Sequence, residues 1–388
     1  MKNFKNNNTL SFLDLNDVKE SHSHKKPCKI LVLADDRHDA RVVLDYIESF
    51  KKYSKNMVLI INPIHETLNN ISIHEFDCIV IHYSIFILSE YFFSKEWSDY
   101  VTKFNGKKVQ IIQDEFRKIN LMKKKMASLG ISIIFTSLNV ENAKKVYGGN
   151  ILSNVIVVSC LPGYISEYLY DLKTLPIDQR NIDIFYRGRV LPANVGLNAY
   201  EKFEIGHMFS EIAEKFNLVV DIKSKENERI YGYEWLKNLS NAKATLGVES
   251  GATIFDFDGN VEKLLEEFVT KNFDTNFFER MEHIKSYQNN IIHFTLPPKL
   301  LEAIATNTAL ILFKGDYRGI LEPGIHYIEL AKDGSNIEHV IQKLKDTKYL
   351  QTISNNAKKD ILNQEKLSFK FLVSKIDLLV NGDFQANI

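Results

Sequence analysis

The chain has 388 residues, of which 45% are hydrophobic and 25% are charged, and its 49 basic side chains balance 49 acidic ones. This length and composition indicate a globular protein with two domains, and the zero net charge argues against binding to nucleic acid or anionic lipid through bulk charge. The three cysteines lie far apart without a Cys-x-x-Cys pair, which excludes a disulfide framework and a cysteine zinc site and favours the cytoplasm.

The N-terminal segment, residues 1–26, is polar and lacks the apolar core of a signal peptide. We expect a loose leader here, and we interpret His22 and His24 as part of this polar segment rather than as metal ligands. No run of about 18 apolar residues occurs in the chain. We therefore expect no transmembrane segment, and at most peripheral association with the inner face of the membrane.

Six apolar runs between residues 28 and 159 alternate with helical or polar segments, and the first of them is CKILVLAD. A continuous apolar run that ends in polar residues is typical of a parallel strand buried on both faces. The alternation predicts a doubly wound parallel sheet over residues 27–165. In such sheets ligands bind beyond the carboxyl ends of the strands. The polar side chains that follow the runs are Asp35, Asp36, Arg37, His82, Tyr83, Ser84, Gln113, Asp114, Glu115 and Arg117.

A proline-containing segment interrupts this rhythm, and we place an interdomain linker at residues 166–181. A second α/β set begins with the strand-like run NIDIFYR and extends over residues 182–350. The remaining residues, 351–388, are mostly helix-patterned, and we expect this tail to pack back across both domains.

Three groups in the second predicted domain lie where strands end and suit a phosphorylated ligand. Arginine can hold phosphate with two hydrogen bonds, glycine allows close approach of the backbone, and free N–H groups attract anions. For an arginine after a strand, the alternative is an ordinary surface ion pair. The groups are Arg187, Gly188 and Arg189; Glu249, Ser250 and Gly251; and Lys299, Leu300 and Glu302.

The third group belongs to a predicted helix that starts at a Pro-Pro pair, where proline costs no hydrogen bond. Lys299 falls in the first turn, where the helix dipole disfavours a cation unless an anion is bound. Glu302 follows on the same helix. A cation and a carboxylate at the start of a βα unit suit the phosphates and ribose hydroxyls of a nucleotide. The alternative is a capped amphipathic helix with ordinary surface charges.

The stretch PPKLLEAIATNTALILFKGDYRGILEPGIHYIEL, which begins at Pro297, resembles the donor-binding half of GT-B glycosyltransferases, most closely the spore-maturation-protein-like branch. IQDEFR, DIFYRGR and GVESGATIFDFDG are similar to motifs of bacterial members of that branch. The resemblance covers residues 110–345 by motif and the first sheet by architecture. It implies two Rossmann-like domains facing across a cleft, an acceptor domain followed by a nucleotide-sugar domain.

The resemblance also implies roles for single residues. Lys299 and Arg189 would neutralise the diphosphate of the donor, Glu302 would hold the ribose hydroxyls, and the loop around Ser250 and Gly251 would line the nucleotide. Many retaining members carry a second glutamate eight positions before the one that matches Glu302, but here that position is Phe294. The stereochemistry of the reaction is therefore not carried over.

Asp256-Phe257-Asp258 has the spelling of a metal-binding loop, but it follows GATIF in the second predicted domain. We interpret it as part of the donor-domain loop, and we expect neither a metal nor another cofactor. Cations and a helix N-terminus can stabilise a departing diphosphate without a metal.

The acceptor hydroxyl needs a general base, and His82, Asp114 and Glu115 are the candidates at neighbouring strand ends of the first sheet. For His82 the alternative is a histidine satisfied inside the strand layer. For Asp114 and Glu115 it is a structural ion pair with Arg117.

The resemblance implies a cytoplasmic glycosyltransferase that transfers a sugar from a nucleotide-diphospho-sugar to a glycan or lipid-linked glycan in surface polysaccharide synthesis, without a nucleic-acid partner. Two other functions remain open. A GT-B-fold sugar-nucleotide epimerase would turn over the donor without an acceptor. A non-catalytic nucleotide-sugar-binding protein would bind the donor and neither transfer nor hydrolyse it.

Overall fold

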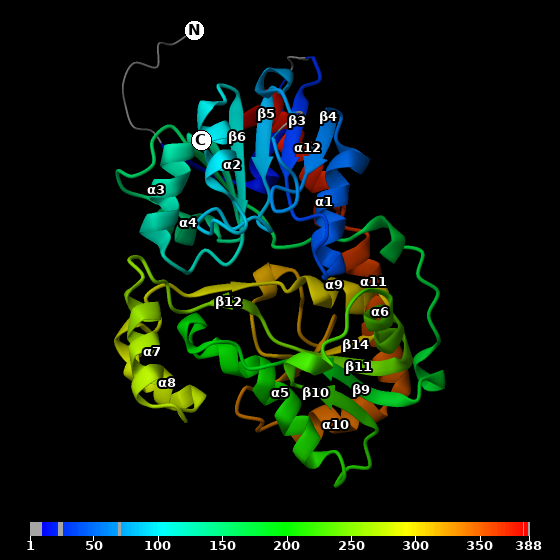
Figure 1. The fold of residues 1–388 in the computed structure, drawn as a ribbon. Helices are drawn as coiled ribbons and strands as arrows, with labels where there is room; N and C mark the ends of the chain where they lie inside the picture. The colour runs from blue at the N-terminus through cyan, green and yellow to red at the C-terminus, as the bar shows by residue number, and fades with distance from the viewer. Residues whose placement is uncertain (1–9, 22–25, 69–70, 383, 387–388) are drawn as a thin grey trace. The chain divides into compact units, whose positions relative to one another are not determined.

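The computed structural model describes residues 10–21, 26–68, 71–382 and 384–386 (Figure 1). His22 and His24 lie outside the described residues. The chain divides into two compact units. The first unit comprises Met1–Pro162, Asp256–Asn260 and Phe369–Ile388, and the second comprises Gly163–Phe255 and Val261–Ser368.

A seven-stranded parallel sheet forms the centre of the first unit, in the order β1-β8-β7-β6-β5-β3-β4. The central strands β3 and β5 are buried almost throughout, as their continuous apolar runs predict. The chain order reverses between β3 and β5, which is the topological switch point of a doubly wound sheet. The strands are β1 (Ser11–Asp14), β3 (Lys29–Leu33), β4 (Met57–Ile61), β5 (Cys78–Ile81), β6 (Lys107–Ile112), β7 (Ile133–Thr136) and β8 (Ile156–Ser159).

The prediction of a loose leader is wrong for residues 11–20. β1 pairs in parallel with β8 and extends the sheet, and β2 (Val18–Glu20) pairs antiparallel with β16 (Phe384–Ala386). The apolar side chains Leu13, Leu15 and Val18 are buried, and this burial holds the segment in place. The polar residues that surround them hide the strand pattern in the sequence.

Five α-helices lie among the described residues of the first unit, and α1 and α12 pack against each other in it (Figure 1). Asp377 of α12 accepts hydrogen bonds from the hydroxyl of Ser54, the backbone N–H of Lys55 and the side-chain amide of Asn56, at 2.7, 2.7 and 2.8 Å. These bonds fix the C-terminal helix to the segment between α1 and β4. The helices are α1 (Arg41–Tyr53), α2 (Lys95–Lys103), α3 (Ile119–Leu129), α4 (Val140–Tyr147) and α12 (Phe369–Asn381).

The second unit contains a five-stranded parallel sheet in the order β10-β9-β11-β14-β15, with its switch point between β9 and β11. An antiparallel pair, β12 and β13, lies outside this sheet. The strands are β9 (Ile182–Arg187), β10 (Val220–Lys223), β11 (Ala242–Gly247), β12 (Ser250–Ala252), β13 (His293–Thr295), β14 (Ala309–Phe313) and β15 (Ile328–Leu330).

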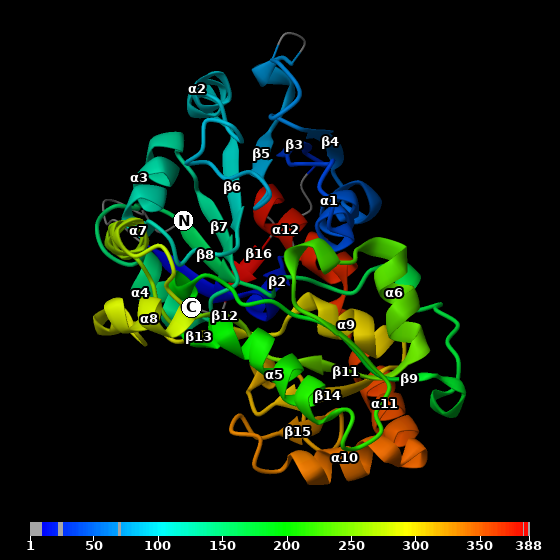
Figure 2. The same ribbon diagram turned by 60° about the horizontal axis from the view of Figure 1, so that its bottom comes forward.

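Seven helices follow the strands of this unit. α10 and α11 pack against each other and against β15 and β14 (Figure 2), and they close the main core around Ile311, Leu344 and Ile353. The helices are α5 (Asn198–Ile212), α6 (Gly232–Asn241), α7 (Asn260–Lys271), α8 (Phe277–His283), α9 (Pro298–Ala305), α10 (Ile337–Lys345) and α11 (Thr347–Leu362). The prediction of two doubly wound parallel sheets is confirmed. No helix of the described residues has the length and apolar character that a membrane span requires.

Two boundaries differ from the prediction. The predicted linker, residues 166–181, belongs to the second unit, because Ile177 is buried in its core and Arg180 donates hydrogen bonds to the carbonyl oxygens of Ala242 and Thr306. Residues 256–260 belong to the first unit instead of the donor-domain loop.

The reason for the second difference is a set of hydrogen bonds to the segment that leads into α3. The backbone N–H of Asp256 donates to the carbonyl oxygen of Phe116 at 2.8 Å, and the side-chain amide of Asn120 donates to Asp258 at 2.9 Å. These hydrogen bonds join residues that are far apart in the chain, so no local sequence pattern predicts them.

Candidate functional site

Lys299 is the central residue of the polar group in the second unit. Pro297 and Pro298 start α9 as predicted, so that Lys299 lies in its first turn, part-buried. Its ammonium lies 4.7 Å from the centre of the Tyr186 ring. Burial and the charge of Lys202 lower the pKa of Lys299 to about 7, against the opposing effect of Glu302. A bound anion would restore the charged form of this lysine.

Glu302 is held from a neighbouring helix. The indole N–H of Trp235 on α6 donates a hydrogen bond to Oε2 of Glu302 at 2.8 Å. The Trp235 ring packs against Phe185 of β9, with ring centres 5.3 Å apart. The carboxylate therefore has a fixed orientation one turn after Lys299, on the same helix.

The two arginines of the group have partners. Arg187 donates two parallel hydrogen bonds, both of 2.9 Å, to the carboxylate of Asp221 on β10, and its guanidinium lies over the Phe185 ring. The alternative reading of Arg187 as a structural ion pair is therefore the one that the structure supports. Arg189 is exposed and forms a 3.1 Å ion pair with Glu226, which is exposed as well. An exposed ion pair is weak, so Arg189 can exchange Glu226 for a ligand.

Gly188 lies between these arginines in a tightly packed position. A Cβ here would come within 2.3 Å of both the Lys202 carbonyl oxygen and the Tyr186 hydroxyl, so only glycine fits. Because Gly188 has no side chain, the end of β9 packs against α5. This packing brings Tyr186 of β9 and Lys202 of α5 close to Lys299.

Glu249 is an anchor for a loop. Its buried carboxylate accepts a 2.9 Å hydrogen bond from the backbone N–H of Tyr317, and burial raises its pKa. Tyr317 and Arg318 both have positive φ, at 48° and 58°, which non-glycine residues rarely adopt. Glu249 thus stabilises the turn that follows β14, a structural task that was not predicted for it.

Ser250 and Gly251 lie in β12, opposite Thr295 and Phe294 of β13. Gly251 has a φ of +121°, and a Cβ here would lie 2.0 Å from the carbonyl oxygen of His293, so the position requires glycine. The side-chain amide of Asn198 donates to the carbonyl oxygen of Gly251 at 2.9 Å. The predicted nucleotide loop is therefore one strand of a two-stranded antiparallel sheet, whose other strand comes from residues 293–295.

Phe294, at the position where the sequence resemblance leads us to expect a glutamate, lies beside a cation. The ammonium of Lys332 lies 5.6 Å from the centre of its ring and forms a 2.7 Å ion pair with Glu201. His293 beside it is buried, which lowers its pKa to about 4.

Leu300, predicted at the donor, is instead a core residue that packs where Gly247 has no side chain.

In the first unit, His82 is fully buried after β5. Its Nδ1 lies 2.9 Å from the hydroxyl of Ser84, and the Tyr46 and Tyr83 rings pack around it with centres 4.8 and 4.0 Å away. Burial lowers its pKa to about 3, so the imidazole is neutral at physiological pH. The structure places this histidine inside the strand layer, but its Nε2 has no hydrogen-bond partner among the described residues.

Glu115 is also buried. It accepts a hydrogen bond from the Thr136 hydroxyl, and burial raises its pKa to about 8. A carboxyl group with this pKa is mostly protonated at pH 7. The structure therefore separates the two adjacent acids, because Asp114 is exposed while Glu115 points into the interior.

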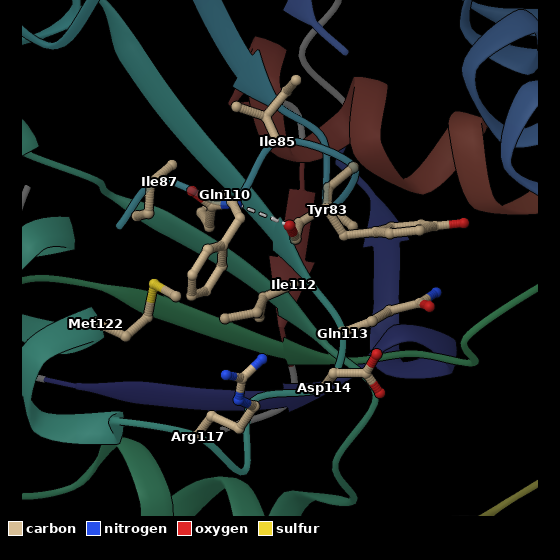
Figure 3. Close-up of a pocket in the computed structure, with 11 residues that line it drawn as sticks. Tyr83, Ile85, Ile87, Gln110, Ile112, Gln113, Asp114, Arg117 and Met122 are labelled. Atoms are coloured by element: carbon tan, nitrogen blue, oxygen red, sulfur yellow. Dashed lines mark hydrogen bonds between the residues drawn. The ribbon is translucent and has the colours of Figure 1, made fainter. Parts of the chain in front are cut away.

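Asp114 follows β6 with a φ of 55°, a left-handed conformation that Asp tolerates better than most residues. It lies at a pocket of about 180 Å³ beyond the carboxyl ends of β5 and β6 (Figure 3). Strained residues of this kind cluster at functional sites. The pocket is lined by Tyr83, Ile85, Phe86, Ile87, Gln110, Ile111, Ile112, Gln113, Asp114, Arg117 and Met122.

Four residues of these sites were not predicted from the sequence: Lys202, Trp235, Gln110 and Lys332. One signal for Trp235 was its rarity, since the chain has only two tryptophans. No group of three or more His, Cys, Asp or Glu side chains within the described part of the chain has an arrangement that suits a metal ion.

No protein-family model matches the chain, and comparison with curated protein sequences gives no match. Similar solved structures include an α-glucosyltransferase in complex with UDP-glucose and DNA that contains an abasic site (TM-score 0.56, 12% identity, 92% of this chain and 100% of that chain). T4 phage BGT in complex with UDP-glucose has a TM-score of 0.51 and 13% identity, over 91% of this chain and 98% of that chain. HepE of Anabaena in complex with UDP and glucose has a TM-score of 0.51 and 11% identity, over 92% of this chain and 100% of that chain. These likenesses confirm the predicted GT-B fold.

Proposed function

We propose that this protein is a glycosyltransferase that binds a nucleotide-diphospho-sugar in its second unit and transfers the sugar to a hydroxyl group of an acceptor. The observation that carries the proposal is the pairing of Lys299, a depressed-pKa cation in the first turn of α9, with Glu302, a carboxylate fixed by Trp235. The similar structures were solved with UDP or UDP-glucose, so a uridine diphospho-sugar is the first donor to test.

In this reaction an oxygen of the acceptor forms a bond to the anomeric carbon, and the bond from that carbon to the diphosphate breaks. Negative charge develops on the departing diphosphate, where the ammonium and the backbone N–H of Lys299, in the first turn of α9, would stabilise it. Glu302 would accept hydrogen bonds from the ribose hydroxyls. The exposed Arg189 would complete the positive charge around the phosphates.

The acceptor proton would pass to Asp114, the one exposed carboxylate among the three predicted base candidates. His82 and Glu115 are assigned structural roles because both are buried and neither lines the pocket at Asp114. We retain the prediction that no metal is needed. T4 phage BGT was also solved with UDP and Mn²⁺, so transfer in excess chelator is the appropriate test.

The finer assignment rests on the sequence resemblance to the spore-maturation-protein-like branch. It places the acceptor among glycans or lipid-linked glycans of surface polysaccharide synthesis, on the cytoplasmic side of the membrane. Because one similar structure was solved with DNA, a DNA duplex is a necessary competing acceptor in the assay. The zero net charge favours the glycan over DNA.

The test is calorimetric titration with UDP-glucose of the wild type, Lys299→Ala and Glu302→Ala. Lys215→Ala and Glu214→Ala, at two exposed positions just beyond the end of α5, are the matched controls. Loss of binding in the first two variants alone supports the donor site. Equal affinity in all four would contradict it. Conversion of UDP-glucose to another nucleotide-sugar without acceptor would instead identify an epimerase, and binding without any turnover would identify a binding protein.

A further inference from the structure

Gln110 is a polar residue inside a buried strand. It lies in β6, in the apolar run KKVQII, and only 2% of its surface is exposed. A buried amide is unfavourable unless its hydrogen-bonding groups have partners. The position in the middle of the strand therefore calls for an explanation beyond packing.

Only one end of the Gln110 amide is paired. Its nitrogen donates to the carbonyl oxygens of Ile81 and Ile111, at 3.4 and 2.8 Å. Its oxygen, Oε1, is buried and has no hydrogen-bond partner in the described part of the chain. Rotating the amide by 180° would place Oε1 against those carbonyl oxygens, so the assignment of nitrogen and oxygen is fixed.

This amide lies in the wall of the pocket near Asp114. Figure 3 shows its nitrogen on the side of the dashed hydrogen bond and its oxygen facing the other way, towards Ile87. Ile85, Ile87 and Met122 give the pocket apolar walls. A ligand in this pocket lies against Gln110 among apolar side chains on one part of the lining and the polar side chains of Gln113, Asp114 and Arg117 on another.

The volume limits what can enter. An apolar cavity of about 150 Å³ holds one benzene molecule, and a water molecule occupies about 30 Å³ of liquid. The pocket of about 180 Å³ therefore accommodates one six-membered ring with a substituent.

We propose that Gln110 determines acceptor specificity: its Oε1 accepts a hydrogen bond from an O–H or N–H group on a six-membered ring of the acceptor. This proposal rests on the proposed function and adds the chemistry of the acceptor, a ring with a hydrogen-bond donor on its buried edge. The ring is either a hexose or a hydroxylated aromatic group. A site built around a buried acceptor atom discriminates strongly against an analogue without the donor, because the atom is then left unpaired.

The test uses the whole chain with labelled isoleucine methyl groups, so that NMR reports on Ile85, Ile87 and Ile112 in the pocket wall. The probes are phenol, fluorobenzene, which has the same shape without a donor, and methyl glucoside. We expect phenol or methyl glucoside to shift these methyl signals with an affinity about tenfold above that of fluorobenzene. The stronger of the two identifies the kind of ring.

A leucine in place of Gln110 should abolish this difference, with the thermal unfolding curve as the check on folding. The comparison of phenol with fluorobenzene on the wild type stands even where Gln110→Leu fails to fold. Equal affinity for the two, or methyl signals unmoved by all three probes, would overturn the proposal and leave Oε1 to an ordered water.

A parallel titration with UDP-glucose separates this proposal from the proposed function. Donor binding without discrimination in the pocket refutes only the role of Gln110. Discrimination without donor binding refutes the glycosyltransferase and leaves a ring-binding site.

Discussion

In the second unit, the ammonium of Lys299 lies 4.7 Å from the centre of the Tyr186 ring and in the first turn of α9. The ring offers a cation its negative face, while the helix dipole, burial and Lys202 all disfavour the charge. Among the described residues, no carboxylate forms a salt bridge with this lysine within 4.0 Å. The balance places its pKa at about 7, where a diphosphate can determine its protonation.

The first prediction concerns the pH dependence of donor binding. A diphosphate favours the charged form of Lys299, so binding raises a pKa that is about 7 in the free protein. The affinity for UDP-glucose should be constant below pH 7 and fall by up to about tenfold per pH unit above it, with proton uptake on binding at pH 8. Calorimetry in two buffers of different ionisation enthalpy measures this uptake. UDP-glucose is preferable to UDP because it has no terminal phosphate that titrates near pH 6.

Two variants control this experiment. The arginine of Lys299→Arg keeps its charge at every pH used, so the affinity of this variant for UDP-glucose should not depend on pH. Lys299→Met should bind UDP-glucose weakly at both ends of the pH range. Lys215→Met, at an exposed position, should behave as the wild type. Wild-type affinity that stays level from pH 6 to pH 9 would rule out Lys299 as the phosphate ligand.

The second prediction concerns Trp235 and Glu302, whose 2.8 Å hydrogen bond joins α6 to α9. Trp235→Phe keeps the aromatic packing on Phe185 and removes the indole donor. A hydrogen bond to a charged group contributes about 1.5–3 kcal/mol, so we expect the affinity for UDP-glucose to fall by roughly tenfold or more. Calorimetry at one fixed pH measures the loss.

Tryptophan fluorescence gives an independent readout, because the chain has only two tryptophans. Trp97, buried in the first unit, serves as the control. In Trp97→Phe the fluorescence should still respond to the donor, and in Trp235→Phe the response should vanish. A response that persists in Trp235→Phe would place the donor elsewhere.

The fold could be predicted because parallel strands buried on both faces appear as continuous apolar runs, as in Lys29–Leu33. The start of α9 could be predicted as well, since the Pro-Pro pair acts locally. β1 could not, because polar neighbours dilute the burial pattern of Leu13 and Leu15.

The pairing of side chains was much less accessible. Arg187 is neutralised by Asp221, which is 34 positions later and adjacent only through the register of β9 with β10. Asp114 and Glu115 are neighbours in sequence, and the positive φ of Asp114 is part of the turn that leaves one exposed and the other buried. The ion-pair partner and the burial of a side chain depend on contacts between residues that are distant in sequence. A single amino-acid sequence therefore does not reveal them.

The third prediction concerns the buried carboxyl group of Glu115. Its pKa is raised to about 8 in the folded protein and is near 4.5 in the unfolded chain, so between these values only the folded state holds the proton. The free energy of unfolding of the wild type should therefore fall as pH rises through this window, by at most about 1.4 kcal/mol per pH unit. Glu115→Gln keeps the shape without the ionisation and should lose this dependence.

Urea unfolding of both proteins at pH 5, 6.5 and 8 measures the difference. The stability of Glu115→Gln relative to the wild type should grow with pH. Asp99→Asn, at an exposed position on α2, should follow the wild type. Parallel curves for the wild type and Glu115→Gln would mean that Glu115 is ionised in the folded protein.

The fourth prediction separates catalysis from donor binding at Asp114. Asn adopts the left-handed conformation about as readily as Asp, so Asp114→Asn should fold normally despite the φ of 55°. Without the base, the rate of transfer to an acceptor should fall by about 10²–10⁴-fold, while the affinity for UDP-glucose stays at the wild-type value.

Asp114→Ala should lose the same activity and also some stability, because a left-handed alanine is strained by about 1–2 kcal/mol. The matched control is Asp99→Asn, an acidic position on α2 outside the pocket. Transfer rates and calorimetric affinities are measured on the same preparations. If Asp114→Asn transferred sugar at the wild-type rate, the base would have to be another group, because neither His82 nor Glu115 lines the pocket.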